Sequence, residues 1–352
     1  MNLLRRAIVW CSICLFFVGC EQNDEPDKVI IPVNVPSGDG FALLSEYNFF
    51  EGTLSELVPN RDAGVLPYDL NAVLFSDYAL KKRFVYVPDS LKIPFDTTSF
   101  LDFPTGSILI KHFYYTVPDD SNHNIETRLI IKTENGWQPE IYEWNESQTD
   151  ATRTLIGGVR KLDVNVDGSD YSFNYLIPNQ NQCKNCHAFD GEISPIGPSI
   201  QNLNKDYEYV DGSYNQLDRW IENGLLEAPS LLESPRYFSI DDDEGSLDQR
   251  ARSYLAVNCA SCHRREGSAA NSGLYLEYEN TDSLSLGFWK TPVAAGGGSG
   301  GLTYVIEPGF ADESILLYRM IADDVDERMP EIGRELLHQE GIELIREWIN
   351  SL

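Results

Sequence analysis

One pentapeptide pattern occurs twice in this chain, as Cys183-Lys184-Asn185-Cys186-His187 and as Cys259-Ala260-Ser261-Cys262-His263. A chance match to Cys-x-x-Cys-His is expected roughly 0.002 times in a chain with this cysteine and histidine content. On a helical turn, residues i, i+3 and i+4 share one face, so two thiols can bond a porphyrin edge while the next imidazole binds the iron. We therefore predict two covalently bound haem c groups. The thioether residues would be Cys183, Cys186, Cys259 and Cys262, and the axial iron ligands His187 and His263.

Two other sites could use the same residues. A zinc site built from paired Cys-x-x-Cys motifs has its pairs ~15–20 residues apart. Here 72 residues separate Cys186 from Cys259, and zinc gives no reason for a histidine after each pair. A thioredoxin-like redox pair would need a strand–helix setting and no haem. The sequence favours haem over both.

The N-terminus has the pattern of a targeting segment. Arg5 and Arg6 precede the apolar run 7–18, which at about 18 Å is too short to span the ~30 Å hydrocarbon layer of a bilayer. The run ends at Cys20 in a sequence that resembles the lipobox of bacterial lipoproteins, with an ordinary secretory signal as the alternative. We expect a signal peptide over 1–19, lipidation of Cys20 and a flexible acidic tether over 20–39. The expected location is the bacterial cell envelope, lipid-anchored, in the periplasm or at the outer-membrane surface.

The mature chain has two methionines that could complete the coordination of a haem iron. Met329 lies in 326–333, where proline and glycine predict a loop. We predict that Met329 is the sixth ligand of the second haem, opposite His263, because thioether and imidazole together are a common axial pair. Met320 follows Leu316 by four residues on one helical face and is more typical of a core position.

The first haem has no comparable methionine nearby, since residues 188–249 contain neither Met nor His. Three histidines elsewhere are candidates for its sixth ligand: His112, His123 and His338. We name His112 first, although its alternation with apolar residues is more consistent with packing in a strand. A sixth ligand from water, or none, remains open.

From about residue 41 to 177 the pattern predicts strands. The runs 82–87, 107–115 and 127–132 are rich in β-branched and aromatic residues, and Asn135-Gly136 is a strong hairpin signal. We therefore predict a multidomain chain. An all-β domain, sandwich-like or barrel-like, would span 40–178, followed by mainly α-helical cytochrome c-type haem modules: a first c-type haem module over 179–250 and a second cytochrome c-type domain over 251–352. Ile342, Ile345 and Ile349 predict a final amphipathic helix that walls a haem pocket.

Charge limits the partners. The chain has 55 acidic and 27 basic residues, a net charge of −28. Such a chain repels phosphate backbones, so we expect no nucleic-acid binding and a redox partner protein with a basic face.

Several stretches resemble an uncharacterised family of two-haem c-type cytochromes with an N-terminal β domain. They are Pro67-Tyr-Asp-Leu-Asn-Ala-Val-Leu-Phe-Ser-Asp77, Glu143-Trp-Asn-Glu-Ser-Gln-Thr-Asp150, Ile196-Gly-Pro and Asn202-Leu-Asn. The C-terminal third is similar to the cytochrome c domains of planctomycete proteins, in which Pro308-Gly309, Ser314-Ile-Leu and Met329-Pro330 follow the haem motif. The resemblance implies haem binding and electron transfer but no substrate.

The leading expectation is an envelope-anchored cytochrome that transfers electrons between a donor and an acceptor, held to the membrane by its lipid. Two alternatives are a haem enzyme whose open first haem acts on peroxide or another small oxidant, and a β-domain binding module whose haem accepts electrons from a partner oxidoreductase. An electron carrier is favoured over a catalyst with its own substrate, and whether the chain is an enzyme stays open.

Overall fold

The computed structural model describes residues 29–96, 100–117, 122–227, 235–293 and 296–352. Residues 32–352 form one compact unit. The predicted signal peptide, Cys20 and the predicted tether as far as residue 28 lie outside the described residues. Within those ranges, no helix is both long enough and apolar enough to cross a membrane.

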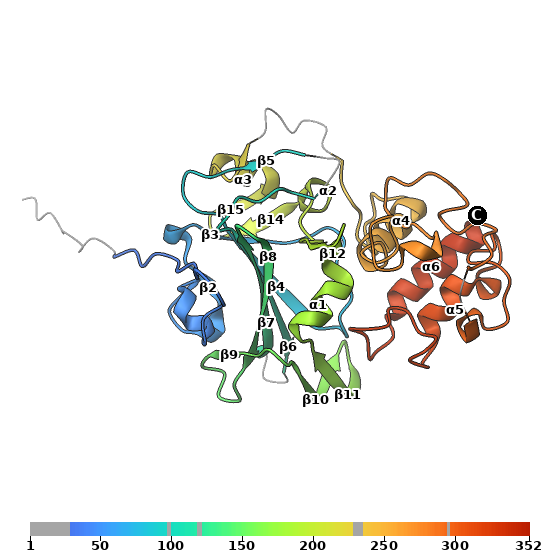
Figure 1. The fold of residues 1–352 in the computed structure, drawn as a ribbon, viewed down its shortest axis with the longest axis horizontal. Helices are drawn as coiled ribbons and strands as arrows, with labels where there is room; N and C mark the ends of the chain where they lie inside the picture. The colour runs from blue at the N-terminus through green and yellow to red at the C-terminus, as the bar shows by residue number, and fades with distance from the viewer. Residues whose placement is uncertain (1–28, 97–99, 118–121, 228–234, 294–295) are drawn as a thin grey trace, which may run out of the picture. The chain divides into compact units, whose positions relative to one another are not determined.

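The N-terminal part is built on one antiparallel sheet of six strands, in the order β3-β4-β6-β7-β8-β9 (Figure 1). The strands are β3 (Val65–Tyr68), β4 (Leu80–Tyr86), β6 (Ile108–Thr116), β7 (Asn122–Thr133), β8 (Gly136–Trp144) and β9 (Ala151–Arg153). The three predicted strand runs are confirmed as β4, β6 and β7. The predicted hairpin is confirmed too, since Thr133 pairs with Gly136 and the glycine takes the φ of +105° that its side-chain-free backbone allows.

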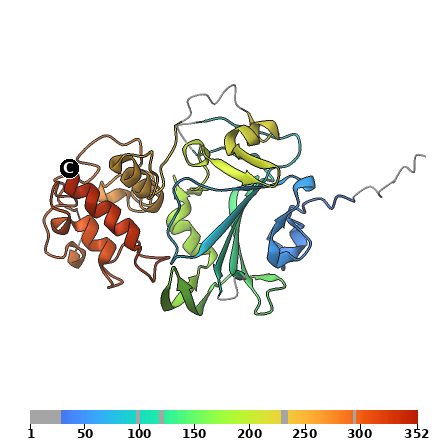
Figure 2. The same ribbon diagram turned by 180° about the vertical axis from the view of Figure 1, so that it is seen from behind.

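Alternation along the strands gives the sheet two apolar faces. On β6, Ile108 and Ile110 join a cluster with Phe49 and Trp144 on one face. Leu109 faces the other side, where it packs with residues of the segment from α2 to β16, drawn yellow in Figure 2. A sheet that is apolar on both faces must be covered on both, and here coils and short helices cover it.

The predicted sandwich or barrel-like form is not what the strand pairing shows in the described part of the chain. The six strands form an open sheet, because β3 and β9 are edges that do not pair with each other. The next two strands, β10 (Gly158–Val166) and β11 (Ser169–Ile177), form a separate two-stranded ribbon. The physical reason is connectivity, because successive hairpins extend one meander while the 32–63 segment and 179–227 occupy the faces that a second sheet would need.

The part that follows residue 177 is more helical, but mixed. Its helices are α1 (Gln180–His187), α2 (Ile200–Leu203), α3 (Gln216–Glu222), α4 (Leu247–Asn258), α5 (Ile315–Ile321) and α6 (Gln339–Ser351). Short ribbons interrupt the first three: β12 (Ala188–Phe189) with β13 (Glu192–Ile193), and β14 (Asp206–Tyr209) with β15 (Gly212–Asn215). The remaining elements are β1 (Phe50–Glu51), β2 (Val58–Pro59), β5 (Ile93–Pro94), β16 (Leu226–Glu227) and 3₁₀ helices at Leu44–Tyr47, Leu54–Glu56, Arg61–Ala63, Ala270–Ser272, Gly296–Ser299 and Ala311–Glu313.

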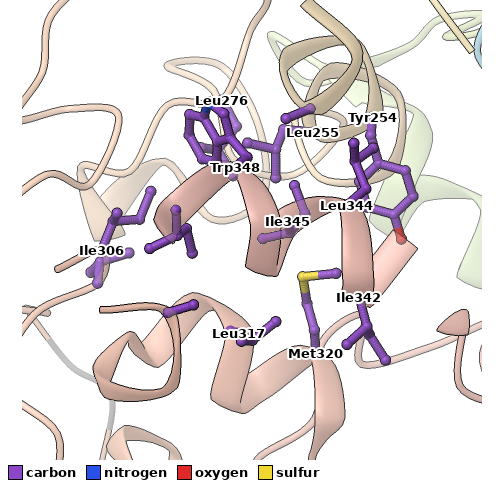
Figure 3. Close-up of a cluster of buried hydrophobic side chains, with 14 of the residues drawn as sticks. Tyr254, Leu255, Leu276, Ile306, Leu317, Met320, Ile342, Leu344, Ile345 and Trp348 are labelled. Carbon is purple, nitrogen blue, oxygen red and sulfur yellow. The ribbon is translucent and has the colours of Figure 1, made fainter. Parts of the chain in front are cut away.

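Helices α4, α5 and α6 share one apolar core (Figure 3). Leu255 of α4, Met320 of α5 and Ile345 and Trp348 of α6 meet there, and the Trp348 indole donates to Asp248 at 2.8 Å. The predicted final helix is confirmed as α6. Its apolar face serves mainly this core, and Ile342 is the residue of α6 that lines the cavity described below.

Candidate cofactor site

A single cavity of about 650 Å³ is lined by both Cys-x-x-Cys-His motifs. Its size falls within the range of about 300–1,000 Å³ typical of small-molecule and cofactor sites. One wall is the face of β4, β6, β7 and β8 that carries Leu109 and Ile141. The other walls come from α1, from the loop at 195–198, from the end of α4 and from the loop that carries Met329.

The first motif is part of helix α1. The helix begins after Asn179, whose side chain accepts from the Gln182 amide at 2.9 Å while the Gln182 side chain accepts from the Asn179 amide at 2.9 Å. This reciprocal cap fixes the start of a short helix that has little apolar surface of its own. Cys183, Cys186 and His187 therefore occupy positions i, i+3 and i+4 of one turn, as predicted from the spacing.

The His187 imidazole is held in one tautomer. Its Nδ1 lies 2.8 Å from the carbonyl oxygen of Ser194, which the β12–β13 ribbon brings back beside the helix. A carbonyl only accepts, so Nδ1 carries the proton and Nε2 keeps its lone pair in the neutral ring. Burial lowers the pKa of His187 to about 4 and keeps the ring neutral, as an iron ligand must be.

The second motif begins where α4 ends. Cys259 caps the helix, and its carbonyl oxygen accepts from the amides of Cys262 at 3.1 Å and His263 at 2.9 Å. These bonds continue the helical turn far enough to place His263 one turn after Cys259. The His263 Nδ1 has only a long contact of 3.4 Å with the Ser272 hydroxyl, and burial lowers its pKa to about 4.

The two motifs touch. The Cys262 Sγ donates to the backbone oxygen of Asn185 at 3.3 Å, and the Ser268 hydroxyl donates to the same oxygen at 3.1 Å. A hydrogen bond to Cys262, together with burial, raises the pKa of the Cys186 thiol. All four motif cysteines are free thiols that are partly buried and line the cavity. Residues 76 positions apart in the sequence are thus neighbours across one cavity.

Met329 lies in a loop, as predicted, and lines the cavity. Its amide donates to the Arg319 oxygen at 2.8 Å, and its own oxygen accepts from the Arg334 guanidinium at 2.7 Å. Arg334 is buried and also donates to the oxygens of Met320 and Ala322, so it fastens the loop to α5. Nothing in the sequence pattern indicated this role of Arg334. Met320 itself is buried in the helical core, as expected, and its side chain also borders the cavity.

His112 is not placed to bind iron. It is fully buried in β6, with Nδ1 2.9 Å from the Thr127 hydroxyl and Nε2 2.9 Å from the Asn124 side-chain oxygen. Both ring nitrogens are engaged and the residue is not among those that line the cavity, so we drop it from the ligand set. His123 does not line the cavity either.

His338 does line the cavity. Its ring stacks on Phe75 at a centroid distance of 4.3 Å, and Nδ1 lies 3.1 Å from the Tyr254 hydroxyl. Across the described ranges, no three His, Cys, Asp or Glu side chains are grouped so as to hold a metal ion.

Two polar residues that sequence reasoning did not identify connect the segment between β3 and β4 to α2 and to the segment before α6. Asn202 accepts from the Ala72 amide at 2.8 Å and donates to the Ala72 oxygen at 3.1 Å. Asp77 is buried and accepts from the amides of Glu335 and Leu336 at 2.7 and 2.8 Å. These residues lie in the stretches quoted above for the family resemblance, which marked them without indicating that they meet.

The chain matches no protein family, no curated protein and no solved structure.

Proposed function

We propose that this chain is a two-haem c-type cytochrome of the bacterial cell envelope, anchored through Cys20, that passes electrons between a donor and an acceptor protein. The observation that carries the proposal is the meeting of both Cys-x-x-Cys-His motifs at one cavity, with Cys262 Sγ 3.3 Å from the Asn185 oxygen. Bound haem supplies one-electron chemistry, and the chain supplies the ligands, the burial and the surface charge.

The residues present suit two attached haems. The four thiols are free and line the cavity, and the first motif histidine keeps a metal-binding lone pair on Nε2 because Nδ1 is bonded to Ser194. Attachment points this close would keep the two haems in one protein interior. That supports exchange of electrons between them before either meets a partner.

The finer assignment of the helical part as cytochrome c-type modules is part of this proposal. It is supported by the Met329 loop, which Arg334 holds at the cavity that also contains the second motif. It also agrees with the resemblance to two-haem cytochromes with an N-terminal β domain. The net charge of −28 supports a partner with a basic face.

One observation favours a catalytic alternative. Apart from His187, the methionines and histidines lining the cavity are Met320, Met329, His263 and His338, and all four follow residue 258. The β-sheet part, as far as it is described, contributes no such ligand. A first haem without a protein sixth ligand would be open to peroxide or another small oxidant.

Haem content tests the proposal. The full chain, exported in a host that attaches haem c, should carry two haems in a pyridine haemochrome assay, and C183S/C186S and C259S/C262S should each carry one. His123→Ala, a histidine away from the cavity, serves as the control and should keep two. A protein without covalent haem overturns the proposal.

Electron transfer is tested with a small basic cytochrome as acceptor. The reduced full chain should oxidise in its presence, and the rate should fall as salt screens the attraction. The ferric spectrum then distinguishes the alternative, since a high-spin component that responds to cyanide and is lost in C183S/C186S would favour the enzyme.

A further inference from the structure

Three basic side chains form a row across the sheet wall of the cavity. In the strand register Arg83 of β4 pairs with Lys111 of β6, and Lys111 pairs with Arg128 of β7. Paired residues project to the same face, and all three line the cavity. Like charges directly opposite one another on neighbouring strands are destabilising. A chain with twice as many acidic as basic residues thus has three cations in a row on the wall of its cavity.

The two arginines of the row have carboxylate partners. Arg83 donates to Asp69 at 2.7 Å, and Arg128 donates to both oxygens of the fully buried Glu126 at 2.9 and 2.6 Å. Asp69 is shared, because Lys205 also reaches it at 3.1 Å. The carboxylates therefore do not balance the cations around them.

Lys111 carries the unbalanced charge. Within the described parts of the chain its ammonium group has no hydrogen-bond partner, and its nitrogen lies over the Phe113 ring at 4.9 Å from the centroid. Burial and the neighbouring cations lower the pKa of Lys111 well below its usual value. The Lys111 side chain is only partly buried and lines the cavity, so a charge placed there without a protein partner calls for an anion or solvent beside it.

The row lies beside the first motif. Cys183, Cys186 and His187 line the same cavity as the three cations, and Cys183 packs against the cluster that contains Phe113 of β6 and Ile141 of β8. Further cations that line the cavity follow the second motif in the chain, among them Lys290 and Arg319, whose guanidinium donates to the Glu327 oxygen at 2.8 Å. What the first motif has beside it is a row of three cations on neighbouring strands of the sheet.

We propose that the row Arg83–Lys111–Arg128 binds an anionic oxygen group, a carboxylate or a small oxyanion, inside the cavity next to the first motif. The Lys111 ammonium and the guanidinium N–H groups of Arg83 and Arg128 that are not bonded to Asp69 or Glu126 supply charge-assisted donors that suit oxygen anions. The group has two sources: a propionate of the first haem, which rests on the proposed function, or a free oxyanion, which does not. In either case the anion neutralises Lys111.

The experiment uses the full chain and titrates it with sulfate and nitrite by calorimetry. Lys111→Gln removes the central charge and Lys111→Arg keeps it. Lys82→Gln is the matched control, because Lys82 lies on β4 next to Arg83 but projects to the opposite face. The same titrations are made in C183S/C186S, which cannot attach the first haem.

A free oxyanion predicts binding by the wild type that weakens at least tenfold in Lys111→Gln, stays within a few-fold in Lys111→Arg, and is unchanged in Lys82→Gln. A propionate predicts no anion binding by the wild type. It also predicts a lower reduction potential of one haem in Lys111→Gln, since a lost cation favours the oxidised haem. In that case the C183S/C186S variant, which lacks the first haem and its propionates, should bind sulfate. Adding Lys111→Gln to that variant should abolish the binding.

The proposal is overturned if neither the wild type nor C183S/C186S binds an anion and Lys111→Gln leaves both potentials unchanged. It is also overturned if Lys111→Arg and Lys111→Gln both convert a low-spin haem to high spin, since Lys111 would then be an iron ligand. Failure of the proposed function is seen separately, as absence of haem. The anion titration can still be made on such a protein.

Discussion

The two Cys-x-x-Cys-His motifs are identical in pattern but lie in different surroundings. The first is on a short capped helix that faces a sheet wall with three cations, and the second follows a long helix at the edge of an apolar core with Met329 nearby. The same five-residue pattern therefore presents two chemically distinct sites. One offers a row of cations on a sheet without a methionine, and the other offers a loop that carries a thioether.

The largest expected effect tests whether the wall of the first site depends on its buried ion pair. Arg128→Met leaves Glu126 buried with only the Tyr175 hydroxyl as a side-chain donor, at 2.6 Å. We expect a loss of about 3 kcal/mol in the free energy of unfolding, measured by denaturant titration. At the second site Arg319→Met removes one bond to a backbone oxygen and should cost about 1 kcal/mol. Equal losses would remove this difference between the sites.

The next effect concerns the joint between the sheet and the Met329 loop. Asp77→Ala leaves the buried amides of Glu335 and Leu336 without their acceptor, and we expect a loss of about 2 kcal/mol. Asp77→Asn keeps an acceptor and tolerates the left-handed φ of +50°, so it should lose less than about 1 kcal/mol. Thermal unfolding of both variants makes the comparison. Equal stability of the alanine and asparagine variants would show that the joint does not depend on this acceptor.

Features encoded locally were predictable from the sequence. The alternation in β6, the Asn135-Gly136 turn and the apolar spacing of α6 depend on neighbours a few residues away, and each element was found where expected. The motif turns are of the same kind, because the spacing of cysteine and histidine on a helix is fixed by helical geometry.

Features that depend on register and on distant contacts were not predictable. Arg83, Lys111 and Arg128 face each other only because β4, β6 and β7 pair with one particular offset, and a shift of one residue would turn one of them to the opposite face. The meeting of Cys262 with Asn185 depends likewise on how two separate segments pack. His112 was named as a ligand because the sequence does not reveal that Asn124 and Thr127 lie beside it.

A smaller effect concerns the dependence of stability on pH and tests a buried histidine of the sheet, His112. Burial lowers the pKa of His112 to about 3, against 6.5 for the free side chain, so the folded protein keeps this ring neutral while the unfolded chain takes up a proton. The stability due to His112 is complete above pH 6.5 and is lost as the pH falls toward 3. Between pH 7.5 and 5.5 we expect a loss of about 1.4 kcal/mol that His112→Gln removes.

Unfolding curves at several pH values measure this effect, and the slope against pH matters rather than the absolute stability of the variant. His123→Gln is the control, because His123 is only partly buried, although burial and the charge of Arg160 also lower its pKa. An unchanged slope in His112→Gln would show that other groups govern the acid sensitivity of the sheet.

The substitutions expected to have the smallest effect on stability test which methionine, Met320 or Met329, is the sixth ligand at the second site. Met320 and Met329 both line the cavity, but Met320 is buried in the core of α4, α5 and α6, whereas Met329 lies in a loop fastened by Arg334. Replacing either methionine by leucine should lower the free energy of unfolding by less than about 1.5 kcal/mol, since leucine and methionine side chains are of similar volume. If Met329 is the sixth ligand, Met329→Leu abolishes the methionine-to-iron band of the ferric protein and lowers the potential of one haem, while Met320→Leu keeps both. The reverse result would make the α5 residue the ligand, and the contrast between the sites would then rest on the helical core rather than on the loop.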